Sequence, residues 1–320
     1  MLAYSPPMRK PDLPDQLRSF GRSYTKKFGL LNRNPYHQDL TLLQSRIIFE
    51  VREHGDVLPS VLAQTLQLDK GYVSRSLAQL INSKVIQARE NPRDKREKFL
   101  RLTSKGKQLF AKIDQASRTR SAEFLGALKP AAREELVKHL VSAELLMGEQ
   151  PLRSEEVVLR SLAPGDIGWV IGRHGEVYFH EYGWNIDFEK LVGEIAVSFA
   201  ASNNPTRERA WIAEARGVRL GCVFVVRENE DVAKLRILLV DPVARGLGLG
   251  SRLVDECIRF ARRANYRKLT LWTNDILHAA RKIYVAAGFQ LTKEERHRSF
   301  GHDLVGQFWE LELQRKFAAG

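Results

Sequence analysis

Residues 240–250 read Val240-Asp241-Pro242-Val243-Ala244-Arg245-Gly246-Leu247-Gly248-Leu249-Gly250, and they decide the fold of the second half of the chain. They follow the apolar run 235–240, which predicts a buried strand, and lead into a helix with an apolar face from Leu249 to Ala261. A glycine-rich turn at a helix N-terminus presents free backbone N–H groups and lets a phosphate approach the main chain. The stretch therefore predicts an anion-binding loop.

The residue spacing around this loop excludes two common classes of nucleotide-binding loop. A dinucleotide fingerprint would need a third glycine at Leu253, and no Gly-Lys-Ser/Thr follows for a P-loop. The pattern Arg245-x-x-Gly248-x-Gly250 instead resembles the loop of the GNAT acetyltransferase superfamily. A strand expected at 268–274, a helix-like segment 279–289 that contains Tyr284, and an alternating strand at 308–313 extend this resemblance over about residues 155–315. The resemblance implies an α/β GNAT acyltransferase fold.

The same resemblance implies acetyl-CoA as cosubstrate, no metal, and direct transfer to an amine. The backbone of 246–250 would bind the pyrophosphate, the amides near Leu239 and Val240 would hold the pantetheine arm, and Tyr284 would protonate the departing thiolate. The family's asparagine would fall near Leu277, where there is none, and Asn274 is the substitute. The implied cofactor-binding set is Leu239, Val240, Arg245, Gly246, Leu247, Gly248, Leu249, Gly250 and Asn274.

The sequence leaves three alternatives for the general base. An ammonium acceptor must lose a proton before it attacks a thioester. The strand 234–240 contains no Asp or Glu, so the carboxylate that some family members place there is absent. Glu214 on the preceding strand, Asp275 after the next one, and an ordered water remain as alternatives.

The acceptor site is expected near residues 174–189, where aromatic and acidic side chains are crowded. Tyr182, Trp184 and Glu189 are the predicted substrate residues, because rings and carboxylates together suit a small cationic amine or amino-acid-like acceptor. The alternative is that the rings pack at the edge of the core and the acids are solvated. His174 and His180 are expected at the surface. A second cluster at 294–303 joins the last strands beside the expected site.

The first half of the chain carries a helix-turn-helix pattern. A short helix after Leu58-Pro59-Ser60 is followed by the turn 69–71 and a second helix. In that helix the spacing predicts an inward stripe of Val73, Leu77, Leu80 and Ile81. It leaves on the outer side a set of residues that suit base edges and phosphates, namely Tyr72, Ser74, Arg75, Ser76 and Gln79.

Two strand-like segments, 85–89 and 99–103, follow and flank a basic tip. A hairpin in this position predicts a wing that reaches the DNA backbone or minor groove. The ordered elements, with Asp94, Lys95 and Arg96 in the tip, resemble the MarR family over about residues 12–148. That resemblance implies a double-stranded DNA operator as partner, wing contacts from Arg93, Lys95 and Arg96, and a homodimer interface formed by helices at 12–32 and 105–148.

The distribution of charged residues also indicates that the two halves of the chain differ. Residues 1–150 carry 26 Lys and Arg against 16 Asp and Glu, whereas residues 151–320 carry 25 against 22. A basic half indicates a polyanionic partner for that half alone. We therefore expect an all-α winged helix-turn-helix domain with a small β wing over 1–150, and an α/β GNAT domain over 151–320.

Two features bear on location. No run approaches the roughly 18 apolar residues of a membrane span, and the first residues lack the apolar core of a signal peptide. Cys222 and Cys257 stand alone, without metal-ligand spacing, and are interpreted as small buried residues. A cytoplasmic protein without membrane contact is expected.

The sequence thus favours a DNA-binding transcription regulator with an acetyl-CoA-dependent N-acetyltransferase domain for a small amine or amino-acid-like acceptor. Two alternatives stay open. The second domain could be a non-catalytic sensor of acetyl-CoA, which the missing strand carboxylate favours, or a protein-lysine acetyltransferase. A panel of amines and peptides would discriminate among the three.

Overall fold

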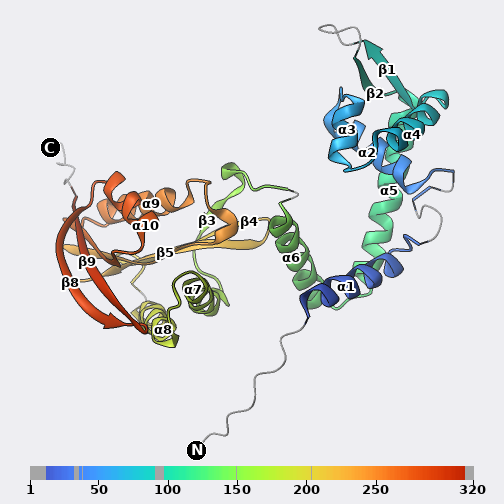
Figure 1. Ribbon diagram of the computed structural model, residues 1–320. Coiled ribbons are helices and arrows are strands. Elements are labelled where there is room, and N and C mark those ends of the chain that lie inside the picture. The colour runs from blue at the N-terminus through green and yellow to red at the C-terminus, as the bar shows by residue number, and fades with distance from the viewer. Residues whose placement is uncertain are drawn as a thin grey trace, which may run out of the picture. The chain divides into compact units, whose positions relative to one another are not determined.

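The computed structural model describes residues 12–31, 36–37, 39–90, 97–148, 150–202 and 204–313 (Figure 1). The chain divides into two compact units, Met1–Pro130 and Ala131–Gly320. This division falls inside the helical region that the sequence assigns to the first domain, so the expected boundary near residue 150 stays a prediction.

The first unit is a small helical domain with a two-stranded wing. Its helices are α1 (Leu13–Lys27), α2 (Leu42–His54), α3 (Pro59–Thr65), α4 (Lys70–Asn82) and α5 (Ser104–Gly126), and its hairpin is formed by β1 (Ile86–Glu90) and β2 (Lys98–Leu102). β1 and β2 pair antiparallel, and Val57 adds a bridge to Leu100. The described parts of the wing therefore follow the predicted order of elements.

Local capping sets where these helices begin. Thr41 and Gln44 form a capping box at the start of α2. The Asp69 side chain accepts from the Tyr72 amide at the start of α4, and Thr103 caps α5 through the Gly106 amide. Each such cap satisfies an N–H group that the helix itself leaves without a partner. α4 is therefore held at its N-terminus, the end that carries Tyr72.

The core of the first unit lies between α2, α3, α4 and the hairpin, and Ile47, Leu62, Leu80 and Leu100 are among its most buried side chains. The predicted inward stripe of α4 is confirmed for Val73, Leu77 and Leu80. It is wrong for Ile81, which is 36% exposed because the last turn of α4 extends past the core.

The second unit begins with α6 (Pro130–Met147) and contains a seven-stranded sheet. The strands are β3 (Val158–Arg160), β4 (Arg209–Ala215), β5 (Val218–Arg227), β6 (Val232–Val240), β7 (Lys268–Asn274), β8 (Gln290–Ser299) and β9 (His302–Glu312). Their spatial order is β3-β4-β5-β6-β7-β9-β8. Among the strands that the structure describes, only the β6–β7 pair is parallel. The mixed sheet with helices confirms the predicted α/β class.

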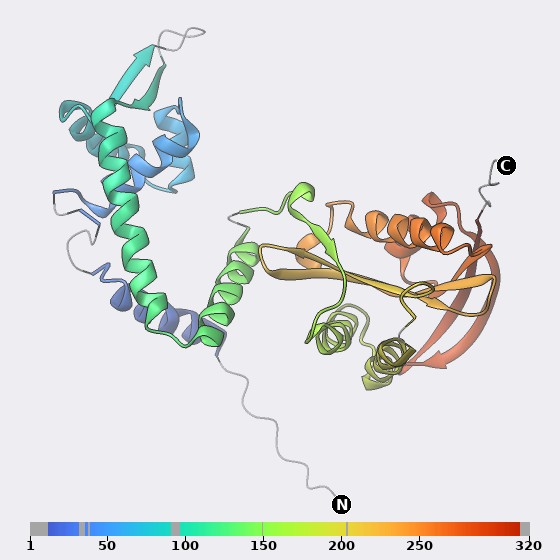
Figure 2. The same ribbon diagram turned by 180° about the vertical axis from the view of Figure 1, so that it is seen from behind.

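Helices cover both faces of this sheet (Figures 1 and 2). α9 (Leu249–Arg263) and α10 (His278–Ala286) lie on one face, and α7 (Asp166–Tyr182) and α8 (Ile186–Ser202) lie on the other. Leu253, Val254 and Cys257 of α9 belong to the larger core, whereas Cys222 and Phe224 pack toward α7 and α8. Both cysteines are buried and free, as predicted.

Strands β6 and β7 separate shortly before the glycine loop of residues 241–250. β6 and β7 pair only from Val232 with Lys268 to Leu235 with Leu271. On the other side of β6, the register with β5 shifts between Cys222 and Phe224, and Ile237 takes a positive φ of 52°. A β-branched residue is rarely found there because its side chain crowds the backbone. The bulge therefore redirects the second half of β6, which leads into the glycine loop.

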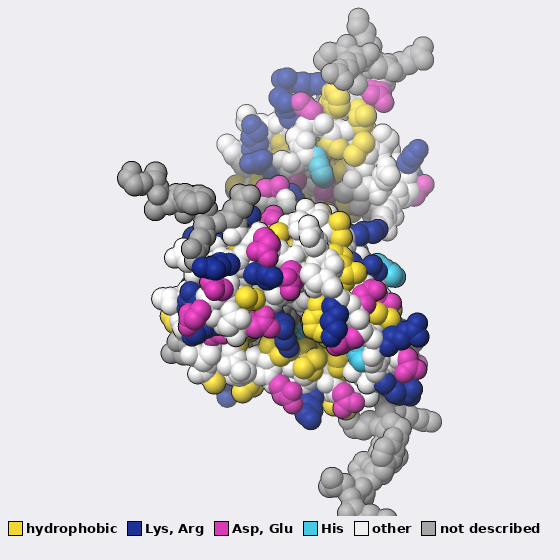
Figure 3. All heavy atoms as spheres, turned by 90° about the vertical axis from the view of Figure 1, so that its left-hand side faces the viewer, with side chains coloured by type: hydrophobic (Ala, Val, Ile, Leu, Met, Phe, Trp, Pro, Cys, Tyr) yellow, Lys and Arg dark blue, Asp and Glu magenta, His cyan; other side chains and the backbone are white. Residues whose placement is uncertain are grey.

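The surface of the second unit near β8 and β9 carries basic and acidic side chains intermixed (Figure 3). Lys293, Glu295, Arg296 and Arg298 of β8 contribute to this pattern. Such an interspersed surface does not resemble a nucleic-acid-binding patch, in agreement with the near-neutral composition of this half. No described helix is long and apolar enough to span a membrane.

Candidate acetyl-transfer site

The glycine loop connects β6 to α9 and is held at its start by Asp241. This buried carboxylate accepts from the Val243 amide through Oδ1 at 3.1 Å, and its Oδ2 accepts from Nε of Arg173 on α7 at 2.7 Å. The aspartate thus fixes both the turn of the loop and its place against α7.

The loop glycines have backbone conformations that other residues adopt with strain. Gly246 has φ 82° and Gly248 has φ 70°. Gly248 is the N-cap of α9, and it has no side chain to cap that helix. The first N–H groups of α9 therefore stay open to a ligand, and the helix dipole favours an anion there.

A cavity of about 410 Å³ lies against this loop, and we call it the loop cavity. It is lined by Val177, Tyr178, Glu181, Tyr182, Leu238, Leu239, Val240, Ala244, Arg245, Gly246, Gly248, Leu249, Gly250, Ser251, Leu277, Ala279, Ala280 and Ile283. The structure thus brings together seven residues of the predicted cofactor set, and Leu247 and Asn274 are the two that do not line the cavity. Arg245 forms an ion pair with Glu181 at 2.7 Å.

A second, smaller cavity of about 100 Å³ lies on the α8 side of the open sheet, and we call it the aromatic pocket. It is lined by His174, Tyr178, Trp184, Phe188, Leu191, Val192, Ile195, Leu235, Arg236, Ile237, Leu238, Trp272, Thr273, Asn274, Leu277, Ala280 and Tyr284. Tyr178, Leu238, Leu277 and Ala280 line both cavities. The two spaces therefore adjoin where β6 and β7 separate.

Tyr284, the predicted acid, lies on α10 and lines the aromatic pocket. Its side chain is only 4% exposed, and its ring packs 5.9 Å from that of Phe289. Burial raises the pKa of Tyr284, and the nearby Tyr178 adds to the effect. The hydroxyl therefore stays protonated at neutral pH, as a proton donor requires.

His174 lies inside the unit, so its expected surface position was wrong. It is 2% exposed, its Nδ1 donates to the Val170 carbonyl at 2.7 Å, and its Nε2 is buried without a hydrogen-bond partner among the described residues. Burial lowers the pKa of His174 to about 4. The imidazole is therefore neutral at physiological pH, and Nε2 carries a lone pair at the pocket wall.

Asn274, predicted to contact the cofactor, faces the aromatic pocket instead. It is 1% exposed, and Oδ1 accepts from Nε2 of His297 at 2.9 Å. Nδ1 of His297 is 2.9 Å from the Ser299 hydroxyl. This chain of contacts ties β8 to the pocket wall, a link across strands that sequence spacing alone does not reveal.

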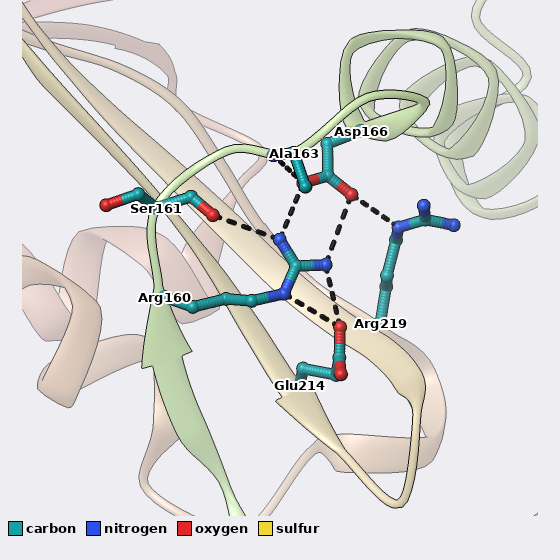
Figure 4. A network of polar contacts seen from close by, with 6 residues as sticks. All are labelled: Arg160, Ser161, Ala163, Asp166, Glu214 and Arg219. Carbon is teal, nitrogen blue, oxygen red and sulfur yellow. Dashed lines mark hydrogen bonds and ion pairs between the residues drawn. The ribbon is translucent and has the colours of Figure 1, made fainter.

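Glu214, a candidate base, lies in an ion-pair network away from both cavities (Figure 4). Its Oε2 accepts from Nη2 of Arg160 at 2.7 Å. Arg160 also binds Asp166, which is 0% exposed and accepts from Nε of Arg219 at 2.7 Å. Because Glu214 lines neither cavity, its position does not support a base role.

Asp275, the second candidate base, lies just after β7 and lines neither cavity. Its Oδ1 is buried without a partner among the described residues, and its backbone carbonyl accepts from Arg281. No acidic side chain lines the aromatic pocket within the described part of the chain. No described cluster of three or more His, Cys, Asp or Glu is arranged to hold a metal ion.

The predicted acceptor residues separate in the structure. Trp184 is 3% exposed and lines the aromatic pocket, and Tyr182 lines the loop cavity. Glu189 lines neither, and its carboxylate lies against Gly175 of α7. His174 and Tyr178, from the expected acceptor segment 174–189, line the pocket together with Arg236, for which no role was predicted. In the sequence, the sign of this role was a charged residue, Arg236, within the otherwise apolar run 235–240.

The predicted DNA-contacting residues of α4 are exposed with one exception. Tyr72, Ser74, Arg75 and Gln79 are exposed, and Gln79 accepts from Gln44 at 2.8 Å. Ser76 is 8% exposed, so its predicted outer position was wrong, because the stripe beginning at Val73 passes over it at i+3. The wing residues Arg93, Lys95 and Arg96 lie outside the described residues.

Comparison with known proteins assigns each unit to a family. The model of the acetyltransferase (GNAT) family matches residues 174–289, and the model of the MarR family matches residues 38–97. An uncharacterised N-acetyltransferase of Schizosaccharomyces pombe is 30% identical over 121 residues, which cover 38% of this chain and 74% of the relative. The multiple antibiotic resistance protein MarR of Salmonella typhimurium is 30% identical over 128 residues, which cover 40% of this chain and 81% of the relative.

The chain therefore belongs to the GNAT acetyltransferase family in its second half and to the MarR family in its first. Membership of the GNAT family supports acetyl-CoA as the cosubstrate. The N-acetylaspartate synthetase of Danio rerio is 34% identical over 91 residues, but these cover 28% of this chain and 32% of that protein.

Proposed function

We propose that this protein is a DNA-binding regulator whose second unit transfers an acetyl group from acetyl-CoA to the amine of a small acceptor. One observation carries the proposal. The loop cavity and the aromatic pocket adjoin at the opening of the sheet, with a buried tyrosine hydroxyl on the second. An acetyl donor and an acceptor in adjoining cavities would meet at that junction.

The residues of the loop cavity fit acetyl-CoA. Open amides at the start of α9 suit a pyrophosphate, and the end of β6, free of β7, leaves Leu239 and Val240 beside the space for a pantetheine arm. Bound acetyl-CoA supplies an activated acetyl thioester. Transfer forms an amide N–C bond as the thioester C–S bond breaks. Tyr284 gives its phenolic proton to the sulfur that leaves, and the proton that the amine nitrogen loses passes through water to the phenolate, so the products are the amide and the free thiol.

The size of the aromatic pocket supports a small acceptor. Its volume of about 100 Å³ favours a compact acceptor over an extended peptide segment. A relative that makes N-acetylaspartate, matched over a third of its length, points to amino-acid-like acceptors too. Thiol release from acetyl-CoA with a panel of amines, amino acids and lysine peptides tests this proposal. Turnover on peptides alone would contradict it.

A sensor role is the second candidate, because no described acidic side chain lines the aromatic pocket as a base. In that case the protein would bind acetyl-CoA tightly and turn over no acceptor. Calorimetry with CoA, run beside the thiol assay, separates the two functions.

A side chain at Gly248 is expected to weaken CoA binding by about 10-fold, because it projects into the anion-binding loop and strains a left-handed residue. The test is the Kd of CoA for Gly248→Ala, measured by calorimetry. Gly217→Ala is the matched control, since Gly217 has φ 76°, open space around it and no place in the loop cavity. Equal Kd values for the two variants would refute the loop assignment.

Removal of the exposed Arg75 on α4 is expected to weaken binding to a random-sequence DNA duplex and to reduce the salt slope by about 1, since one phosphate contact is lost. Fluorescence anisotropy at several salt concentrations measures both quantities. Arg118→Ala is the control, because Arg118 lies on α5 and pairs with Asp114 at 2.7 Å. If both variants keep the wild-type slope, α4 does not face the phosphates.

A further inference from the structure

The aromatic pocket has one charged side chain among the described residues that line it. Arg236 is a cation, and His174 is neutral at physiological pH, whereas the other lining residues are aromatic, aliphatic or uncharged polar. A pocket with these walls carries a net positive charge. It opposes a purely cationic amine and favours an anionic group.

Arg236 has no partner of its own. None of the described residues forms a hydrogen bond or ion pair with its guanidinium, although the side chain is partly buried. Burial lowers the pKa of Arg236, and the carboxylate of Glu228 only partly offsets this. Lys234, two residues earlier on the same strand, is in contrast paired with Glu228 at 3.0 Å. A partly desolvated cation without an ion-pair partner is costly to the fold, and an anionic ligand would remove that cost.

The strand geometry sends Arg236 to the acceptor side. Leu235 points into the larger core under α9, so its neighbour Arg236 points to the opposite face, where α8 lies. On β7, Leu271 packs into the same core as Leu235, and Trp272 faces the pocket with Arg236. The cation thus belongs to the pocket floor.

His174 supplies the complementary polar atom. Its Nε2 lone pair is buried at the pocket wall without a partner in the described structure, and the Nδ1 contact with Val170 fixes which nitrogen is free. A lone pair in this position accepts an N–H donor. The pocket therefore offers one site for an anion and one for an N–H group.

We propose that the acetyl acceptor is an apolar amino acid, whose carboxylate binds Arg236 and whose amine donates to Nε2 of His174. The apolar side chain of the acceptor packs against Phe188, Leu191 and Ile195 of α8. This inference rests on the proposed acetyl transfer and names the acceptor class for it. It replaces the expectation of a cationic amine held by carboxylates.

The test compares acceptors that differ only in the carboxylate. L-leucine, L-methionine and L-phenylalanine are paired with isopentylamine, 3-(methylthio)propylamine and phenethylamine, and thiol release from acetyl-CoA is measured with the full-length protein. Wild type is expected to prefer the acid of at least one pair by about 10- to 100-fold in kcat/KM, the range for a charge-assisted contact.

Arg236→Met is expected to raise KM for the amino acid, so that the kcat/KM ratio of each amino acid to its matched amine falls toward 1. Arg236→Lys retains part of the preference, because an ammonium keeps the charge but loses the bidentate geometry. Lys234→Met is the matched control, since Lys234 lies on the same strand and lines neither cavity. It keeps the wild-type preference.

Each outcome decides the inference. A wild type that acetylates amines as well as the matched acids overturns it, as does an Arg236→Met variant that keeps the preference. Absence of turnover on every acceptor would defeat the proposed transfer. In that case, calorimetry tests separately whether Arg236 binds the carboxylate of the amino acid. Binding of L-leucine, L-methionine or L-phenylalanine to the CoA-bound wild type, weakened at least 10-fold in Arg236→Met, supports the inference, and no binding of any of them overturns it.

Discussion

A Tyr284→Phe variant is expected to release thiol from acetyl-CoA about 10²- to 10⁴-fold more slowly than wild type, because that is the usual contribution of a positioned proton donor. The change removes one oxygen and keeps the ring that packs on Phe289. The fall should appear in kcat with little change in the KM of acetyl-CoA. Steady-state thiol release at saturating acceptor measures it.

Two further tyrosines make this experiment specific. Tyr266→Phe is the control, because Tyr266 is 2% exposed, donates to the Arg207 carbonyl at 2.8 Å and lines neither cavity. Tyr178→Phe tests the second hydroxyl near the junction. Unchanged turnover in Tyr284→Phe together with a large loss in Tyr178→Phe would move the acid role to Tyr178.

Asp166→Ala is expected to lower the free energy of unfolding of the second unit by about 3 kcal/mol, near the lower end for a broken buried ion pair. The side chain is 0% exposed and joins Arg160, Arg219 and the Ala163 amide (Figure 4). Its removal leaves two arginine side chains, each about 30% exposed, without their main partner. Their partial hydration keeps the loss near the lower limit.

Denaturant unfolding followed by tryptophan fluorescence measures this change. All five tryptophans lie between residues 169 and 309, so the signal reports the second unit. Asp303→Ala is the matched control, because this carboxylate is 81% exposed and pairs with Arg298 at the surface. Its removal should change the unfolding free energy by less than about 1 kcal/mol. Equal losses in the two variants would show that the network contributes no more than a surface pair.

The difference in unfolding free energy between wild type and Asp166→Ala should depend on pH, and this dependence gives a second check. Burial by itself raises the pKa of Asp166, but hydrogen bonds from Arg160, the Ala163 amide and Arg219 outweigh it and hold the pKa at about 2, below the ordinary 3.8. A depressed carboxyl pKa stabilises the fold above the ordinary value, and that contribution is lost as the pH falls toward the folded value. The gap between wild type and variant should therefore hold at neutral pH and narrow below pH 3.8.

The sequence predicted the parts that depend on local pattern. Residues 240–250 gave the glycine loop because left-handed turns need glycine, and the helix-turn-helix followed from its spacing. Errors arose where the outcome depends on helix phase, in the last turn of α4 for Ile81 and in the middle of α4 for Ser76. A helix drifts relative to a simple i, i+4 stripe, so flanking residues change sides within one turn.

The acceptor side depends on tertiary contacts that no local pattern reports. His174 is buried because α7 and α8 pack on the sheet, and Arg236 faces a cavity because β6 leaves β7 after Leu235. Glu214 looked available as a base, yet Arg160, which lies 54 residues earlier in the chain, holds it. Partners so far apart in the sequence are brought together only by the fold.

The short parallel pairing of β6 with β7 makes the sheet joined at one end and forked at the other. At the joined end, strand hydrogen bonds and core side chains hold the sheet together, so these residues are needed for folding. The forked end carries Arg236, Trp272 and Asn274, whose side chains face a small space and not the larger core. Selection for a new acceptor can therefore exchange Arg236 without disturbing the larger core, so specificity is free to diverge while the scaffold stays constant.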